Sequence, residues 1–414
     1  MKQEKALSYL KEGHNVFITG PAGSGKTYLL NEYIDWLRKE NINVAITAST
    51  GIAATHIGGQ TIHSWSAIGI KDSLSEYDLD ALSQKQHLYK RFHETDVLII
   101  DEVSMLHSYR LDMVDKVLKK IRNNDEPFGG LQVVLSGDYF QLPPINRGYS
   151  SSKNFAFEAE VWKQLDLSVC YLDRVFRQDE DPLLIILEEL RAGELSEDSM
   201  FKLQERTEES APEDTPVTRL YTHNVDVDRL NADELTKLPG ESQKFRMTSY
   251  GKKADVDTLV KNCLAPEVLE LKISAQVMFV KNNFQSGYVN GTLGTVIDFE
   301  FGSPIVETLE GKRIVVEFES WILDSATGKE AEIRQFPLRL AWAITVHKSQ
   351  GMTLDAAEID LSKSFVAGMG YVALSRVSTL NGLFITGANQ QALSVEPLLK
   401  EQDILFQKQS SDLE

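Results

Sequence analysis

The sequence has few cysteines and no long apolar run. Only Cys170 and Cys263 are cysteines among 414 residues, and no metal-binding spacing surrounds them, so we expect buried, reduced thiols. No apolar stretch approaches the roughly 20 residues of a membrane-spanning helix. The start of the chain, MKQEKALSYLKEG, is amphipathic and lacks the apolar core of a signal peptide. These absences argue against a membrane protein or a disulfide-stabilised secreted domain and predict a cytoplasmic protein.

Basic residues are also scarce, with 43 Lys and Arg against 61 Asp and Glu and a net charge of −18. A nucleic-acid-binding protein normally presents a basic surface. The acidic excess is concentrated in residues 179–234, which hold 17 acidic and 5 basic residues. The remaining chain, with 44 acids and 38 bases, is close to neutral. A local basic track is therefore compatible with this composition, provided that the acidic segment faces away from any bound strand.

The most informative stretch is a glycine-rich turn between a predicted strand, Asn15–Thr19, and a predicted helix, Lys26–Lys39. The pattern GxxxxGK[ST] in this context is typical of a loop that cradles phosphates with inward-turned backbone N–H groups. A lysine there reaches the β- and γ-phosphates, and the threonine hydroxyl is a ligand for Mg²⁺. The weaker alternative is a plain glycine turn with a solvated lysine. The predicted nucleotide-binding residues are Gly20, Gly23, Ser24, Gly25, Lys26 and Thr27.

Gln3 precedes this loop on a predicted helix, Lys2–Lys11. A glutamine amide donates and accepts hydrogen bonds at once and could read the edge of an adenine. A surface glutamine is an equally good interpretation.

A second signal is the apolar run Val97–Ile100, which predicts a strand buried on both faces of a parallel sheet. It ends in Asp101 and Glu102, and carboxylates at such a strand end lie beside the phosphate loop. We expect Asp101 to bind Mg²⁺ and Glu102 to activate the attacking water. The alternative is an acidic strand end without chemistry.

A third predicted strand, Leu131–Ser136, follows a helix at Arg110–Arg122 and leads into Asp138 and Gln141. Gln141 is a candidate sensor of the γ-phosphate. Tyr139 and Phe140 are expected to transmit its state to a partner outside the domain.

The stretch Thr47–Trp65 is rich in small and hydroxyl residues and contains Thr50, His63 and Trp65. Hydroxyls and amides hold phosphates without net charge, and an aromatic ring offers a stacking face for a base. A tight turn with a buried tryptophan explains the stretch equally well. Residues 66–93 are expected to form a small insertion.

The second half alternates strand and helix patterns up to about residue 275 and then changes character. Short β-type runs separated by Gly-Ser-Pro turns predict a small antiparallel barrel at about 297–337. The apolar run LRLAWAIT, interpreted as helix-like, precedes His347 and Lys348, which are candidates for phosphate contacts. The tail beyond Ala388 is expected to form a terminal helix without distinct chemistry.

Together these motifs resemble the PIF (petite integration frequency) family of DNA helicases, in superfamily one B, in a compact bacterial form. The resemblance covers nearly the whole chain, from residue 15 to 377. It is carried by NVFITGPAGSGKT, TASTGIAATHIGGQTIHS, LIIDEVSML, PFGGLQVVLSGDYFQLPP, VFRQ, VNGTLGTV, FPLRLAWAITVHKSQGMTLD and GYVALSRV.

The resemblance implies an α/β fold with two RecA-like domains and ATP in the cleft between them. We expect the first domain at residues 1–178, with an insertion at about 64–93, and the second at 179–414, with the barrel inserted. Arg177 and Arg376 match the family's two arginine fingers. The DNA-binding residues implied are Thr50, His63, Trp65, Phe140, His347 and Lys348.

The resemblance further implies an ATP- and Mg²⁺-dependent helicase, a monomer that moves 5′ to 3′ on single-stranded DNA and opens junctions with duplex DNA. Such enzymes act in DNA replication, repair and telomere maintenance, and four-stranded G-quadruplex DNA is a further candidate substrate. Two alternatives stay open. One is an ATP-gated switch that binds single strands without unwinding; the other is a small-molecule P-loop kinase, against which the paired arginines argue.

Overall fold

Two units make up the chain in the computed structural model. Unit 1 comprises Met1–Phe176, Asp324–Gly328 and Pro397–Glu414, and unit 2 comprises Arg177–Leu323 and Lys329–Glu396. The structure describes residues 1–69, 71–144, 155–173, 181–211, 217–221, 227–283, 285–325, 328–346, 348–362, 364 and 367–413.

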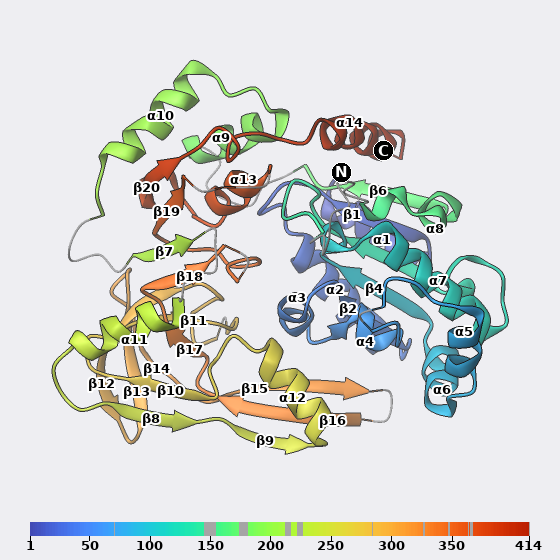
Figure 1. The fold of residues 1–414 in the computed structure, drawn as a ribbon, viewed down its shortest axis with the longest axis horizontal. Coiled ribbons are helices and arrows are strands. Elements are labelled where there is room, and N and C mark those ends of the chain that lie inside the picture. The colour runs from blue at the N-terminus through green and yellow to red at the C-terminus, as the bar shows by residue number, and fades with distance from the viewer. Residues whose placement is uncertain are drawn as a thin grey trace. The chain divides into compact units, whose positions relative to one another are not determined.

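A six-stranded parallel sheet forms the centre of unit 1, in the order β3-β2-β4-β5-β1-β6 (Figure 1). The central strands β1, β4 and β5 are buried because three or four successive apolar residues form the body of each, with polar residues at their ends. The carboxyl ends of neighbouring parallel strands meet at one sheet edge, which brings their polar residues together. The strands are β1 (Asn15–Thr19), β2 (Val44–Ala48), β3 (Gln60–Thr61), β4 (Val97–Asp101), β5 (Gln132–Ser136) and β6 (Leu167–Tyr171).

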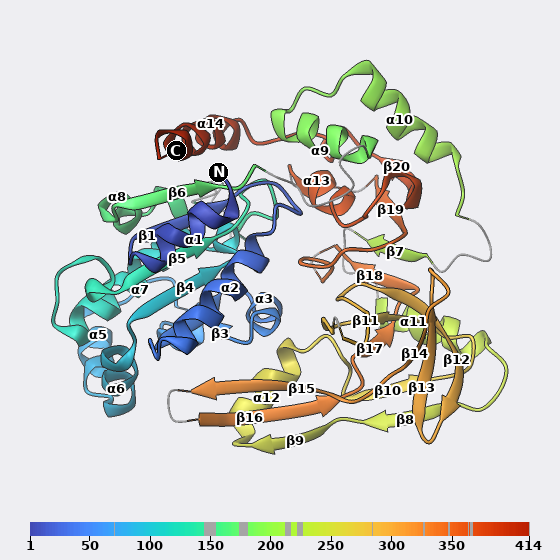
Figure 2. The same ribbon diagram turned by 180° about the vertical axis from the view of Figure 1, so that it is seen from behind.

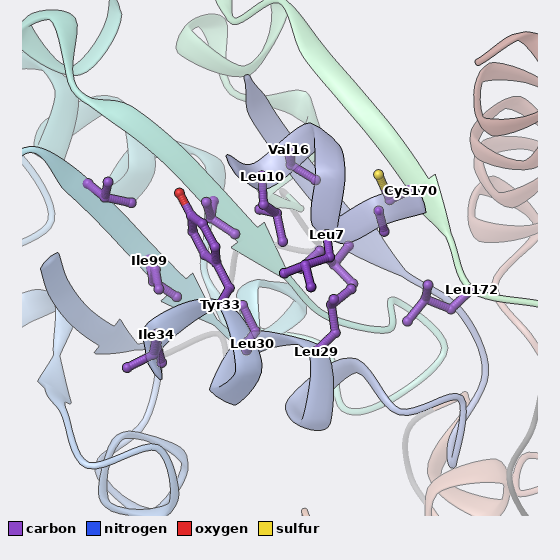
Figure 3. Packing of buried hydrophobic residues seen from close by; sticks show 14 of the residues in the cluster. Leu7, Leu10, Val16, Leu29, Leu30, Tyr33, Ile34, Ile99, Cys170 and Leu172 are labelled. Carbon is purple, nitrogen blue, oxygen red and sulfur yellow. The ribbon is translucent and has the colours of Figure 1, made fainter. Parts of the chain in front are cut away.

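Helices α1 (Gln3–Lys11) and α2 (Lys26–Lys39) pack on this sheet through a continuous apolar core. Figure 3 shows Leu7 and Leu10 of α1 and Leu30 and Tyr33 of α2 turned toward the strands. This packing fixes the start of α2, and therefore the loop before it. Residues 1–171 of unit 1 also form helices α3 (Gly51–His56), α7 (Ser108–Arg122) and α8 (Glu160–Gln164), with short 3₁₀ turns at Val103–Met105, Pro127–Gly130 and Ala156–Glu158.

The expected insertion at about 64–93 contains helices α5 (Glu76–Ser83) and α6 (Gln86–Glu94), after α4 (Ile62–Trp65). Ser75 caps α5 in a reciprocal capping box with Asp78. Buried Leu79, Leu82, Leu88 and Phe92 show that α5 and α6 have an apolar face.

The C-terminal helix α14 (Pro397–Asp412) groups with unit 1 and not with the second domain, where we expected it. It lies along β6: the Tyr171 N–H donates to Ser410 Oγ at 3.0 Å, and the Tyr171 hydroxyl donates to Asp403 at 3.1 Å. Phe406 is buried against Phe17 of β1, with ring centroids 5.0 Å apart. The last segment of the chain therefore belongs to unit 1, far in sequence from β6.

Unit 2 contains a four-stranded parallel sheet in the order β18-β7-β19-β20 (Figure 2). Its parallel strands agree with the predicted α/β class. The strands are β7 (Thr218–Tyr221), β18 (Ala343–Thr345), β19 (Ala357–Leu361) and β20 (Leu383–Ala388). The helices nearby in the chain are α9 (Pro182–Ala192), α10 (Glu197–Glu208), α11 (Val227–Lys237) and α13 (Met369–Leu374), with a 3₁₀ turn at Leu380–Gly382.

The run LRLAWAIT forms two short strands, β17 (Leu338–Leu340) and β18, so the helix-like interpretation was wrong. Buried short strands and buried helices share the same apolar composition, and only pairing partners separate them. β17 pairs with β11 and β18 pairs with β7, so this stretch joins two different sheets.

The antiparallel part of unit 2 is larger than the expected barrel at about 297–337. A five-stranded sheet in the order β14-β13-β12-β11-β17 shares one apolar core with a two-stranded sheet, β10-β8. A third sheet, β15-β16-β9, packs with helix α12 (Lys253–Asn262) around a smaller core. The strands are β8 (Gln243–Arg246), β9 (Thr248–Gly251), β10 (Val268–Leu271), β11 (Gln276–Phe279), β12 (Leu293–Glu300), β13 (Ser303–Thr308), β14 (Arg313–Val315), β15 (Glu319–Ser325) and β16 (Gly328–Gln335).

Among the described residues, no helix combines the length and the apolar character needed to cross a bilayer. Cys170 is buried and Cys263 partly buried, and both are free. Burial raises the pKa of each thiol to about 12, so both stay protonated at neutral pH.

Candidate nucleotide-binding site

The glycine-rich turn joins β1 directly to α2, as the sequence predicts. Gly20 has a φ of 139°, and a Cβ at this position would lie 2.4 Å from the carbonyl oxygen of Leu172, so a larger residue cannot fit. Gly25 caps α2 in the left-handed region, with a φ of 84°. The turn thus aims backbone N–H groups and the positive end of a 14-residue helix at one point.

The ammonium of Lys26 lies inside this turn, where it donates to the carbonyl oxygens of Gly20 at 2.8 Å and Pro21 at 2.9 Å. Ser24 is fully buried in the same turn. A phosphate entering the turn offers Lys26 a charged acceptor in place of these neutral carbonyls.

Gln3 of α1 lies against the loop. Its side-chain amide donates to the carbonyl oxygens of Ser24 and Gly25, each at 3.3 Å. A residue that precedes the loop by about 20 positions is therefore adjacent to it in space. Contact with an adenine stays a prediction.

Asp101 ends β4 and is buried beside the loop. Burial raises the pKa of Asp101, while the nearby Ser136 hydroxyl, the Glu102 backbone and the charge of Lys26 lower that pKa. Burial has the largest effect on the pKa of Asp101 and favours the protonated form. A cation bound next to Asp101 would favour the ionised carboxylate instead. Asp101 and the hydroxyl of Thr27 are the hard oxygen donors that Mg²⁺ prefers, and they fit the ion expected with a nucleotide. The described residues contain no cluster of three or more His, Cys, Asp or Glu that could hold a metal alone.

Glu102 occupies the left-handed region, with φ 51° and ψ 42°. This conformation costs a non-glycine residue free energy and is held by its surroundings. The Ser49 hydroxyl donates to the Glu102 carbonyl oxygen at 2.7 Å, and the Ser49 N–H donates to that of Asp101 at 3.1 Å. Ser49 therefore holds the backbone of both residues that carry the carboxylates. Ser49 was not predicted as a site residue, although it lies in the hydroxyl-rich stretch Thr47–Trp65.

Gln141 follows β5 in a loop organised by buried Asp138, whose carboxylate accepts from the Phe140 N–H at 3.1 Å. Gln141 is 6% exposed, and its Oε1 atom has no hydrogen-bond partner among the described residues. Burying an amide oxygen without a hydrogen-bond partner costs free energy of folding, and a bound ligand that donates a hydrogen bond would remove that cost.

Tyr139 and Phe140 are both buried, with exposed fractions of 5% and 4%. The Tyr139 ring lies in an aromatic cluster of unit 1, 4.8 Å from Phe157 between ring centroids. We expected these rings to signal outward and Phe140 to contact DNA. In this conformation a base cannot reach either ring, because both rings are packed against protein.

Thr50, His63 and Trp65 lie within 16 positions of one another after β2. Thr50 caps α3, with its hydroxyl accepting from the Ala53 N–H at 3.3 Å. Burial, and then the charges of Arg110 and His107, lower the pKa of His63 to about 4, so this imidazole is neutral at pH 7. Trp65 is 3% exposed and packs on Phe92 at 4.9 Å between centroids. The buried-tryptophan alternative is therefore the correct one for Trp65, since its faces are covered.

The remaining predicted site residues belong to unit 2 or lie outside the described residues. Arg376 follows α13, is 4% exposed, and donates to the carbonyl oxygen of Val372 at 3.0 Å and to Ser375 Oγ at 2.8 Å. Lys348 is partly buried, and its N–H donates to Thr345 Oγ1 at 3.3 Å. Arg177 and His347 lie outside the described residues, so their roles stay predictions.

Comparison with known proteins adds a family to this geometry. A family model described as PIF1-like helicase matches residues 2–186, and one described as DNA helicase Pif1, 2B domain, matches residues 256–299. The chain is 45% identical to an ATP-dependent DNA helicase Pif1 of Psychrobacter sp., over 98% of this chain and 71% of that protein. It is 36% identical to the ATP-dependent DNA helicase PIF1 of Danio rerio and spans 65% of that protein's length.

Solved structures give the same result for the fold. Pif1 from Bacteroides sp. in complex with ADP-AlF4 is 32% identical, with a TM-score of 0.82, and the match covers 98% of this chain and 96% of that one. Bacteroides Pif1 bound to single-stranded DNA is 31% identical over the same shares, with a TM-score of 0.62.

Proposed function

This chain belongs to the PIF1-like helicase family of ATP-dependent DNA helicases, and we propose that it moves 5′ to 3′ on single-stranded DNA and separates the duplex ahead of it. One observation carries the proposal: a phosphate-binding turn holds Lys26 next to a strand that ends in Asp101 and a conformationally strained Glu102. This arrangement fits hydrolysis of a triphosphate, and the family uses such hydrolysis to drive a motor.

In the proposed cycle, Lys26 exchanges its carbonyl partners for the β- and γ-phosphates. Glu102 accepts a proton from the attacking water, and Ser49 holds the Glu102 backbone through its carbonyl oxygen. Thr27 and Asp101 would hold the Mg²⁺ that accompanies ATP, and the ion would supply positive charge to the phosphates. The amide oxygen of Gln141, which lacks a partner among the described residues, accepts a hydrogen bond from the attacking water.

Arg177 and Arg376 are proposed to complete the site when the nucleotide is bound, and an arginine at such a position is worth ~10³ or more in rate. The proposal requires Arg376 to exchange the carbonyl oxygen of Val372 for a phosphate oxygen during the cycle. Thr50, His63, His347 and Lys348 are proposed to contact the strand. Their exchange of contacts as ATP is consumed would produce translocation. We further propose a monomer that acts in the cytoplasm on nucleoid DNA.

Strand displacement tests the polarity. A duplex with a 5′ single-stranded tail should be unwound with ATP and Mg²⁺, and the same duplex with a 3′ tail should not. Unwinding only from the 3′ tail would contradict the proposed direction. A G-quadruplex placed behind a 5′ tail tests the extension to four-stranded DNA.

ATPase measurements separate the two alternatives. Single-strand-stimulated hydrolysis without strand displacement would instead support an ATP-gated binding switch. Hydrolysis that DNA does not stimulate would favour a small-molecule kinase.

A further inference from the structure

A row of basic, hydroxyl and aromatic side chains lies on the surface of unit 2 along β8 and β9. We define the β8–β9 strip as Lys244, Arg246, Thr248, Tyr250, Lys252 and Lys253, all of which are exposed. Figures 1 and 2 both show β8 and β9 running end to end. The stretch 243–253 contains four basic residues and no acid, in a chain whose net charge is −18.

The strip faces solvent, while Phe245 of β8 and Met247, which lies between β8 and β9, are held in two cores. Phe245 packs edge-on against Phe336, with centroids 4.9 Å apart, and Met247 packs against the core that contains Ala331 and Ile333. Side chains alternate in a strand, so Lys244 and Arg246 on either side of Phe245 point away from that core. All four residues of β9 are exposed, so Thr248 and Tyr250 also face solvent. Residues two positions apart on one strand are ~6.6 Å apart.

The positive charge of the strip is mostly uncompensated. Lys244 pairs with Glu270 at 3.1 Å, whereas Arg246, Lys252 and Lys253 have no ion-pair partner in the part of the chain that the structure describes. On the neighbouring strand β16, Arg334 lies opposite Thr248 and Glu332 lies opposite Tyr250 in the strand register. These two residues add one charge of each sign.

The start of α12 adds to the positive potential. Lys252 is its N-cap and Lys253 its first residue, and cations at a helix N-terminus oppose the helix dipole. Asp255 is the acid of that turn, and neither lysine is ion-paired with it. The two lysines destabilise the N-terminus of α12, and a bound anion at this N-terminus would compensate for that unfavourable placement.

The residue types favour a sugar-phosphate backbone as that anion. Lys, Arg, Thr and Tyr are common phosphate contacts in protein–DNA complexes. Sequence-independent single-strand sites instead place several aromatic rings for successive bases, and Tyr250, 70% exposed, is the one aromatic residue of the strip. A duplex turns its bases inward and its phosphates outward, so it needs no such rings.

We propose that the β8–β9 strip binds the phosphate backbone of double-stranded DNA and holds the duplex that the motor has yet to open. The proposal rests on the helicase function above and adds a second DNA contact, distinct from the Thr50, His63 and Lys348 regions. Binding there is independent of base sequence and steeply dependent on salt.

Direct binding tests the strip. In full-length protein, Arg246→Ala, Lys252→Ala and Lys253→Ala are combined, and a matched control combines Lys39→Ala, Lys85→Ala and Lys408→Ala, which removes the same charge from exposed positions of unit 1. Affinity for a blunt-ended duplex and for a single strand is measured over a range of KCl concentrations. We expect the strip variant to bind the duplex about 10-fold more weakly, with a salt slope smaller by about three, since three cations are removed and each lost phosphate contact lowers the slope by about one.

Single-strand affinity and single-strand-stimulated ATPase of the strip variant should match those of the control. If the strip variant binds duplex DNA as tightly as the control variant does, the proposal is overturned. An acidic segment of another protein would then be the next ligand to test on the strip. An equal loss on the single strand would also overturn it, because the strip would then belong to the translocation track. Failure of the helicase function is distinguishable: wild-type protein would then lack strand-stimulated ATPase while duplex binding could still be measured.

Discussion

Phe406, in the C-terminal helix, stacks on Tyr139, with ring centroids 6.1 Å apart and ring planes 23° from parallel. Tyr139 lies between Asp138 and the candidate γ-phosphate sensor Gln141. The last helix of the chain therefore supports the core next to the nucleotide site, although 267 positions separate the two rings.

Removing the Phe406 ring should destabilise unit 1. We expect Phe406→Ala to cost ~3–5 kcal/mol, because a buried ring is replaced by a cavity. Urea unfolding followed by circular dichroism measures this. Ile404→Ala is the matched control on the same helix, since Ile404 is 65% exposed and should change stability little. Equal stability of the two variants would show that α14 does not support the core.

Replacing the Glu102 carboxylate by an amide should separate ATP binding from hydrolysis. Glu102→Gln keeps the side-chain shape but cannot accept the proton of the attacking water, so we expect nucleotide affinity near wild type and turnover reduced ~10²-fold or more. Lys26→Ala, in comparison, should abolish turnover and weaken nucleotide binding. Nucleotide titration and a phosphate-release assay measure the two quantities. Undiminished hydrolysis by Glu102→Gln would remove this residue from its role.

Arg376→Ala should spare DNA binding and lose turnover. We expect at least ~10³-fold slower hydrolysis, the usual worth of an arginine on a transferring phosphate. Arg376 is buried, so folding must be checked by thermal melting. Arg376→Lys keeps a charge without the planar fork and should restore little activity. Parallel loss of single-strand affinity and thermal stability would point to misfolding instead.

Trp65→Ala should act through stability. The ring packs on Phe92, so we expect a loss of ~3–5 kcal/mol, largely recovered by Trp65→Phe. Chemical unfolding measures the difference. A stable Trp65→Ala protein with weakened single-strand binding would restore the base-stacking role that the sequence suggested.

Stability should fall in mild acid through His56. Burial lowers the pKa of His56 to about 4, against an ordinary value of 6.5. Between these pH values the unfolded chain binds a proton that the folded chain does not, so stability is complete above about pH 6.5 and declines toward pH 4. We expect a loss of about 1 kcal/mol from this residue between about pH 7 and pH 5, allowing for its partial exposure.

His56→Gln, which cannot take up a proton, should reduce that pH dependence in thermal melts. The matched control is His87→Gln on the exposed side of α6. Identical pH profiles of the two variants would exclude His56 as the source.

Much of the fold follows from short-range patterns. β1 and α2 have the bounds that the sequence predicted, because an apolar run, a glycine turn and a good helix former each act locally. The run LRLAWAIT was assigned wrongly because a short, mostly apolar run fits a buried helix or two short strands equally well. The antiparallel sheets begin at Gln243, well before the predicted 297, because strands that alternate in burial carry weak individual signals.

The phosphate turn depends on residues that are close together in the sequence. Glycines that can adopt positive φ and a lysine at the start of a helix form such a turn between a strand and a helix, so the sequence alone predicts it. The sequence did not predict which aromatic rings are buried, because Trp65, Tyr139 and Phe406 are buried by partners that are distant in sequence. Burial is a property of three-dimensional packing, so long-range contacts alone decided that Trp65 belongs to the core, that α14 returns to unit 1 and that the strip along β8 and β9 faces water.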